Sequence, residues 1–144
     1  MANTLSGTDA LLLEHLAYED GRIGTRLNPD TLIEKVNLFR PRMIEAATAR
    51  ETITYGALTN DFHDLAWEDI GHVLGLIGLL EDERGRPLLP AVVVNAGSDP
   101  SPGENYFALV EKAAGYGDAP PESDADRRRE VWRAHVHEVW EFDW

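Results

Sequence analysis

The sequence of 144 residues contains no cysteine and almost no lysine. Without cysteine, the chain cannot form a disulfide, hold a metal ion through thiolates or use a thiol as a nucleophile. Lys35 and Lys112 are its only lysines, and with eleven arginines they face 26 acidic residues, so the formal net charge is −13. A charge of this size argues against non-specific binding to nucleic acid or to anionic membranes. The longest apolar stretch, 70–80, is too short and too rich in glycine to cross a bilayer.

The acidic residues are spread along the chain rather than gathered in one run. They are consistent with a surface adapted to high salt or with the composition of a GC-rich genome, and also with an acidic face that binds a partner, including mimicry of a phosphate backbone. The first residues carry no basic segment followed by an apolar run, so we expect no signal peptide and a cytoplasmic protein. Hydrophobic residues make up 43% of the sequence, which is enough to predict one folded domain over 1–144.

Apolar residues recur at helical spacing in several segments that turn residues separate. The predicted helices cover residues 9–20, 30–50, 66–83, 105–114 and 124–142. In the second of these, Pro41 either kinks one long helix or begins a new one. In the third, Gly71, Gly75 and Gly78 share a face. Because each interior glycine costs about 1 kcal/mol relative to alanine, we expect the close approach of another backbone there.

Two short segments favour strands. Glu51–Tyr55 is rich in β-branched residues, and 87–95 contains three consecutive valines, typical of a strand buried on both faces. The predicted fold class is therefore α+β, a single domain with four or five helices around a small sheet. We expect an N-terminal helical region (1–40), a winged-helix-like core (41–114), a linker (115–123) and a C-terminal helix (124–144).

Histidines and carboxylates do not form a convincing metal site in this sequence. His135 and His137 are two positions apart, which on a helix turns their side chains about 200° from each other. His137 with Glu141, and Glu68 with His72, have one-turn spacing, but two ligands are too few to hold an ion. The sequence predicts no metal site and no cofactor.

Candidate catalytic residues are present but form no recognisable arrangement. Asp61, Asp64 and Glu104 could serve as acids or bases, yet carboxylates are so common here that their presence discriminates little. Ser98 and Ser101 lie outside any Gly-X-Ser-X-Gly turn, and the Gly-rich pattern that cradles phosphates is absent. We assign no catalytic residue and favour a binding protein over an enzyme. A small hydrolase or nuclease that uses acids around 97–104 with a divalent ion stays as a third hypothesis.

Residues 96–104 form a loop by composition, rich in glycine and proline. Residues that follow a buried strand are a favoured place for function, because the rigid strand presents them. The candidates in and beside this loop are Asn95, Ser98, Asp99, Glu104, Asn105 and Tyr106.

Three tryptophans lie near the end of the sequence. Trp132 and Trp140 share one face of the last predicted helix with Val136 and Val139, so we expect both indoles to pack against the core. Trp144 either packs back and ties down the tail or contacts a partner protein.

Residues 52–107 combine a Thr-Tyr-Gly turn that enters a helix, a helix with a small residue near its start, a strand that follows a proline, and a glycine-containing loop with a tyrosine after it. The residues that carry this pattern are Thr54, Tyr55, Gly56, Ile70, Gly71, Leu74, Pro90, Val94, Gly103 and Tyr106. In order and rough spacing, about residues 40–110 distantly resemble the winged-helix DNA-binding domain of the alkylguanine-DNA alkyltransferases and the alkyltransferase-like proteins. The resemblance implies a winged-helix core and a DNA-related role.

The sequence also departs from that family. Ala91 occupies the position of the reactive cysteine, which excludes alkyl transfer, and Val92 and Val93 replace the histidine and arginine that follow it. Glu68 falls where the family has the arginine that intrudes into the duplex. Of the family's DNA contacts, the resemblance leaves Tyr55, which it places against the backbone near a flipped nucleotide.

The first hypothesis is a non-catalytic module of winged-helix type that binds nucleic acid or a DNA-bound protein, with no membrane partner. Three arginines near the start of the predicted core are candidate phosphate contacts. The predicted binding residues are Tyr55, Asn95, Asn105, Tyr106, Arg40, Arg42 and Arg50. The second hypothesis is an acidic protein–protein interaction module, such as an accessory, immunity or inhibitor protein, which would use its acidic surface or the C-terminal tryptophans.

Overall fold

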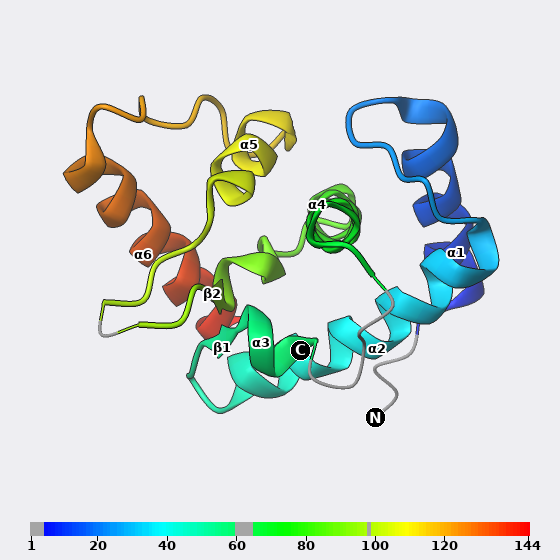
Figure 1. Cartoon of the computed structure of the whole chain (residues 1–144), viewed down its shortest axis with the longest axis horizontal. Coiled ribbons are helices and arrows are strands. Elements are labelled where there is room, and N and C mark those ends of the chain that lie inside the picture. Colours follow the sequence, from blue (N-terminus) through cyan, green and yellow to red (C-terminus); the bar gives the residue numbers. More distant parts are fainter. Residues whose placement is uncertain (1–4, 60–64, 98) are drawn as a thin grey trace.

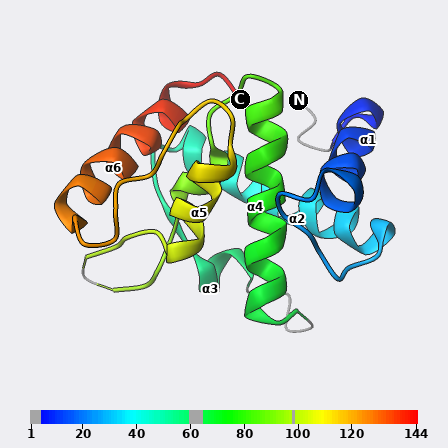
Figure 2. The same cartoon turned by 90° about the horizontal axis from the view of Figure 1, so that it is seen from above.

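Helix α4 (Trp67–Glu83) lies at the centre of the fold, and the other helices pack around it (Figures 1 and 2). The computed structural model describes residues 5–59, 65–97 and 99–144. Within these residues the chain is a single α+β domain, as predicted, but it has six α-helices instead of the expected four or five, with one two-stranded parallel sheet. None of the helices in the described part of the chain is both long and apolar enough to cross a membrane.

The elements follow one another in a simple order along the chain. The helices besides α4 are α1 (Gly7–His15), α2 (Pro29–Thr48), α3 (Tyr55–Leu58), α5 (Glu104–Lys112) and α6 (Ala125–Glu141). A π-helical turn, η1 (Leu16–Asp20), continues α1, and a 3₁₀ helix, η2 (Leu89–Val92), leads into the second strand. The strands are β1 (Ile53–Thr54) and β2 (Val93–Val94).

The glycine stripe of α4 is covered by side chains, which corrects the expectation that another backbone lies against it. A Cβ atom added at Gly71 would meet Nδ2 of Asn105 at 2.7 Å, and one added at Gly75 would meet Cδ1 of Ile23 at 2.7 Å. At Gly78 the nearest atoms belong to the side chain of Leu109. The missing side chains of α4 therefore make room for residues from α5 and from the loop after η1.

Helix α2 runs without a break through Pro41, which settles the alternative between a kinked helix and a second helix in favour of one element. The side chain of Asn28 caps it by accepting a hydrogen bond from the backbone N–H of Thr31 at 2.9 Å. The same helix spans both the N-terminal region predicted over 1–40 and the start of the predicted core.

The two strands pair in parallel, with Ile53 opposite Val93 and Thr54 opposite Val94. The sheet therefore joins the two predicted strand segments, but the second strand is shorter than the predicted 87–95. Residues 89–92 turn into a 3₁₀ helix, since Pro90 has a fixed φ and no N–H to give to a ladder.

Tryptophan side chains of helix α6 hold it to the rest of the fold by hydrogen bonds from their indole nitrogens. Trp132 donates from Nε1 to the carbonyl of Ala91 at 2.8 Å, and Trp140 donates to the carbonyl of Glu51 at 3.0 Å. Their predicted packing is confirmed. Trp144, left open by the sequence, packs back on the core and donates to the carbonyl of Val139 at 2.8 Å.

Candidate ligand-binding site

Three of the predicted binding residues lie around one hollow of about 430 Å³ where both strands end. Tyr55 is the first residue of α3 and follows β1 directly, while Asn95 follows β2 directly. Because Thr54 pairs with Val94 in a parallel register, the residues after them leave the sheet at the same edge. Asn105 reaches the hollow from the first turn of α5. The residues that line it are Tyr55, Gly56, Trp67, Asn95, Ala96, Gly103 and Asn105.

Among the described residues, the lining of this hollow contains aromatic rings and side-chain amides but no charged group. The backbone N–H of Gly103 donates to the Tyr55 hydroxyl and holds the loop before α5 against it. Burial raises the pKa of that hydroxyl, and the hydrogen bond from Gly103 opposes the rise. Tyr55 is thus a neutral, half-buried ring at ordinary pH, with a hydroxyl that still has a proton to donate.

Trp67 is the residue of this hollow that sequence reasoning missed. It begins α4, and 68% of its surface is exposed, which is unusual for so large an apolar side chain. Its spacing groups it with the glycine stripe of α4, against which side chains of α5 pack, so its exposure is not predicted from the sequence. An exposed tryptophan at the edge of a hollow is a common feature of binding surfaces.

Tyr106 lies in the core, which contradicts its prediction as a binding residue. Only 4% of its surface is exposed, and its hydroxyl shares a 2.6 Å hydrogen bond with Nδ1 of His135. The ring of Tyr116 packs edge-on against His135, with 4.9 Å between the centroids. Tyr106 therefore joins α5 to α6 instead of facing a ligand.

The three predicted phosphate contacts do not form one outward patch, which corrects the prediction of a basic surface there. Arg40 is buried and donates from Nε to Oε1 of Glu81 at 2.9 Å. Arg42 is half-buried and donates to the carbonyl of Leu58 at 2.8 Å. Arg50 is exposed, but it pairs with Glu141 at 2.8 Å.

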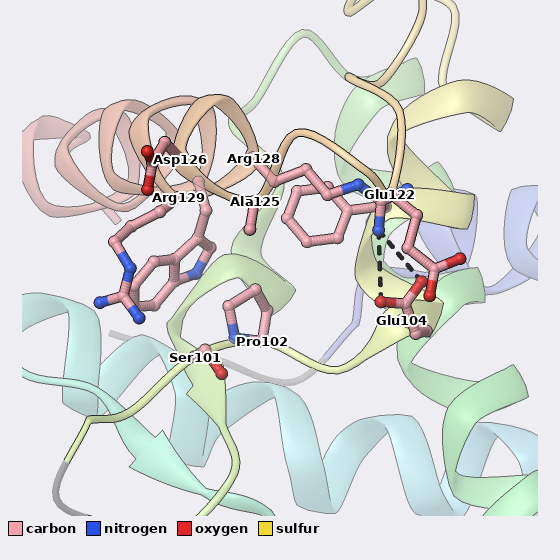
Figure 3. A pocket seen from close by; sticks show the side chains of 10 residues that line it. Ser101, Pro102, Glu104, Glu122, Ala125, Asp126, Arg128 and Arg129 are labelled. Atoms are coloured by element: carbon pink, nitrogen blue, oxygen red, sulfur yellow. Dashed lines mark hydrogen bonds and ion pairs between the residues drawn. The ribbon is translucent and has the colours of Figure 1, made fainter.

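A second hollow, of about 340 Å³, lies between the start of α5 and α6 (Figure 3). Arg128 lies 4.5 Å above the ring of Phe107 and pairs with Glu104 at 3.0 Å, as the dashed lines in Figure 3 show. Arg129 pairs with Asp99 at 2.6 Å. Since both guanidinium groups are held by the chain's own carboxylates, we do not take this hollow as the candidate site.

The remaining candidates are the acidic residues and serines considered for catalysis or metal binding. Asp61, Asp64 and Ser98 lie outside the described residues. Within 5–59, 65–97 and 99–144, no group of three or more His, Asp or Glu side chains is placed to hold a metal ion. Comparison with known proteins finds no matching family model, no matching curated protein and no matching solved structure. The geometry of the hollow beside Tyr55 is therefore the basis for a functional proposal.

The buried pair of Tyr106 and His135 predicts a pH dependence of stability. Burial lowers the pKa of His135 below its ordinary 6.5, so the unfolded chain takes up this proton more readily than the native protein. The native state keeps its full stability above the ordinary pKa and loses stability as pH falls through 6.5 toward the lowered value. The ionisable groups nearest the imidazole are Tyr106 and Tyr116, and Glu138 lies beside Tyr116.

We expect the variant His135→Gln to lose less stability than the wild type between about pH 7.5 and pH 5.5. Urea unfolding at the two pH values measures the difference. His137→Gln is the matched control, because it removes an exposed histidine from the same helix. An equal loss of stability in wild type and His135→Gln would show that this histidine does not carry the effect.

Proposed function

We propose that this protein is a non-catalytic binding module that holds an unpaired base of a nucleic acid in the hollow beside Tyr55. The observation that carries the proposal is the meeting of two aromatic rings, Tyr55 and Trp67, with two side-chain amides, Asn95 and Asn105, in a hollow whose described lining carries no charge. Its volume of about 430 Å³ lies within the usual range for small-ligand sites, about 300–1,000 Å³.

The chemistry of the lining suits a nucleobase. Every base has a flat face, and stacking on an aromatic side chain contributes about 1–3 kcal/mol per base. A side-chain amide carries both a donor and an acceptor, so Asn95 and Asn105 can bond to the edge of a base that is free of its pairing partner. A base inside a duplex presents neither its face nor its pairing edge, which is why the proposal specifies an unpaired one.

Helix α4 is not part of a groove-binding surface in this proposal. Almost every residue from Ile70 to Glu81 is buried against α1, α2, α5 and η2. The exposed residues of α4 lie at its two ends, Trp67 and Glu68 in the first turn and Glu83 in the last. A helix placed in a DNA groove needs an exposed face along its length, and α4 has none.

The charge of the protein makes the expected salt dependence unusual. Phosphate contacts by Lys and Arg make affinity fall steeply with salt, because bound counterions are released. Here the described lining residues are uncharged and the net charge is −13, so the main electrostatic effect on a nucleic acid is repulsion, which salt screens. We expect affinity to hold or rise as salt increases, which is compatible with a salt-adapted protein.

Fluorescence anisotropy of a labelled, unstructured single-stranded oligonucleotide, titrated from about 0.1 M to 1 M salt, tests the proposal. Loss of one stacking partner, in Tyr55→Ala or Trp67→Ala, should weaken binding about tenfold. Leu11→Ala is the matched control, since Leu11 is equally exposed (69%) but lies on α1. If the wild type binds no oligonucleotide at any salt concentration, the proposal is wrong.

A second candidate is an acidic module that binds a partner protein, including a DNA-bound one. The observation that favours it is the exposure of Trp67 on a chain with net charge −13, because tryptophan is enriched at interfaces and an acidic surface attracts a basic partner. Co-purification from the native host distinguishes it. The partner protein should co-purify with the wild type and with Leu11→Ala but not with Trp67→Ala. If no stable partner co-purifies with the wild type, this second candidate function is wrong.

A further inference from the structure

A smaller hollow, of about 190 Å³, adjoins the one beside Tyr55. Its lining residues come from α4, from α5 and from the loop that follows η1. Asn105 lines both hollows, so they share a wall. The residues that line the smaller one are Ile23, Glu68, Gly71, His72, Gly75, Asn105, Ala108, Leu109 and Lys112.

The smaller hollow differs from its neighbour in carrying ionisable side chains. Glu68 and His72 are one turn apart on α4, so both side chains face the same way. In the described part of the chain, Nδ1 of His72 is the one buried side-chain nitrogen or oxygen without a hydrogen-bond partner. Turning this ring to present Nδ1 to the hollow therefore breaks no protein hydrogen bond.

Two charged side chains line this hollow: Glu68, one turn before Gly71, where Asn105 lies against α4, and Lys112, two turns beyond Asn105 on α5. The charge of Glu68 therefore decides which part of a nucleotide fits beside the wall that the two hollows share. Its carboxylate is exposed, and Arg26, which lies near enough to feel its charge, is already bound to both oxygens of Asp69, at 3.1 and 2.9 Å. An ionised carboxylate is negatively charged and can only accept hydrogen bonds. It therefore repels a phosphate group and binds a hydroxyl group that donates to it. Of the parts of a nucleotide next to its base, the sugar is the one with hydroxyl groups to donate.

We propose that the smaller hollow holds the ribose of the nucleotide whose base lies beside Tyr55, and that Glu68 accepts a hydrogen bond from its 2′-hydroxyl. This inference rests on the proposed function. The sugar is bonded directly to the base, so it must occupy the space adjoining the first hollow, across Asn105. His72 supplies a second polar partner, since a hydroxyl can donate to or accept from an imidazole nitrogen. The site thus favours RNA over DNA of the same sequence.

Two oligonucleotides of one sequence, one with ribose and one with 2′-deoxyribose, test the inference by anisotropy at fixed salt. The wild type should bind the ribose form about tenfold more tightly, as expected for one hydrogen bond to a charged acceptor. Glu68→Ala should bring the ratio of the two affinities close to one. A 2′-O-methyl oligonucleotide, which has no hydrogen to donate, should bind no better than the deoxy form.

The affinity ratio separates hydrogen bonding from overall charge. Glu83→Ala is the matched control, because it removes the same charge from the far end of α4. Glu83 pairs with Arg22 and lies outside the hollow. This variant should keep the wild-type ratio of the two affinities. Equal binding of both oligonucleotides by the wild type would overturn the ribose assignment and leave the proposed function standing. A ratio that survives in Glu68→Ala would overturn the role of Glu68. Absence of binding to either would overturn both proposals.

Discussion

Replacing Glu81 with alanine is expected to lower the free energy of unfolding by about 3–5 kcal/mol. Glu81 has no exposed surface and accepts hydrogen bonds from Arg40 at 2.9 and 3.4 Å and from Arg86 at the same two distances. Without the carboxylate, the buried Arg40 guanidinium and the half-buried Arg86 guanidinium lose the acceptor to which both are bound. Breaking a buried ion pair by removing one partner costs far more than the pair itself contributes.

Chemical denaturation of Glu81→Ala and of Glu83→Ala measures this effect against a matched control. Glu83 also pairs with an arginine, Arg22 at 3.0 Å, but its side chain is 40% exposed. An exposed pair contributes about 0–1 kcal/mol, so Glu83→Ala should stay close to wild type. If Glu81→Ala and Glu83→Ala are equally stable, the buried pair does not hold α2 to α4 in the way described.

Replacing Trp132 with alanine should also cost about 3–5 kcal/mol, the usual cost of removing a buried tryptophan. The indole fills the contact between α6 and η2, and its Nε1 satisfies the carbonyl of Ala91. Trp132→Phe keeps most of the ring and removes the donor, so it should lose about 1–3 kcal/mol through the unsatisfied carbonyl.

Trp67→Ala is the matched control for Trp132→Ala, because the same side chain is removed from an exposed position. Surface substitutions of this kind usually change stability by no more than about 0.5 kcal/mol. Thermal unfolding of the three variants would therefore show Trp67→Ala near wild type and Trp132→Ala well below it. A large loss in Trp67→Ala would mean that this side chain supports the fold, and its use as a binding variant would have to be abandoned.

The sequence predicts much of the secondary structure because most of it follows from local spacing. Helix α4 coincides with the predicted 66–83, and both strands fall inside the predicted segments. The structure differs from the prediction at two prolines. Helix α2 continues through Pro41, and η2 replaces part of the expected strand near Pro90. In neither place does the local pattern show which tertiary contacts hold the backbone.

Some of the site residues can also be predicted from local spacing, and others cannot. Tyr55 and Asn95 are found by the rule that residues after a buried strand are presented by it, and the parallel register brings them together. Arg40 and Tyr106 were misplaced although a signal existed. Arg40 falls at helical spacing from Val36 and Met43, and Tyr106 likewise from Leu109, so each lies on the buried face of its helix.

Other features have no local signal at all. Glu81, to which Arg40 donates, is 41 residues away from it, and His135, which bonds to Tyr106, is 29 residues away. Trp67 is 68% exposed, although side chains of α5 lie against Gly71 and Gly78 further along the same face of α4. Such properties arise from the packing of distant segments, which spacing within one helix does not report.

The parallel pairing of β1 with β2 sets an order of events during folding. Residues 53 and 93 are joined by a segment that contains α4, so the strands can meet only after that long loop has closed. Contacts of this sequence separation form late and slowly compared with helices. Tyr55 and Asn95 therefore come together at one of the last steps, and a partly folded chain with its helices already formed would still lack the hollow.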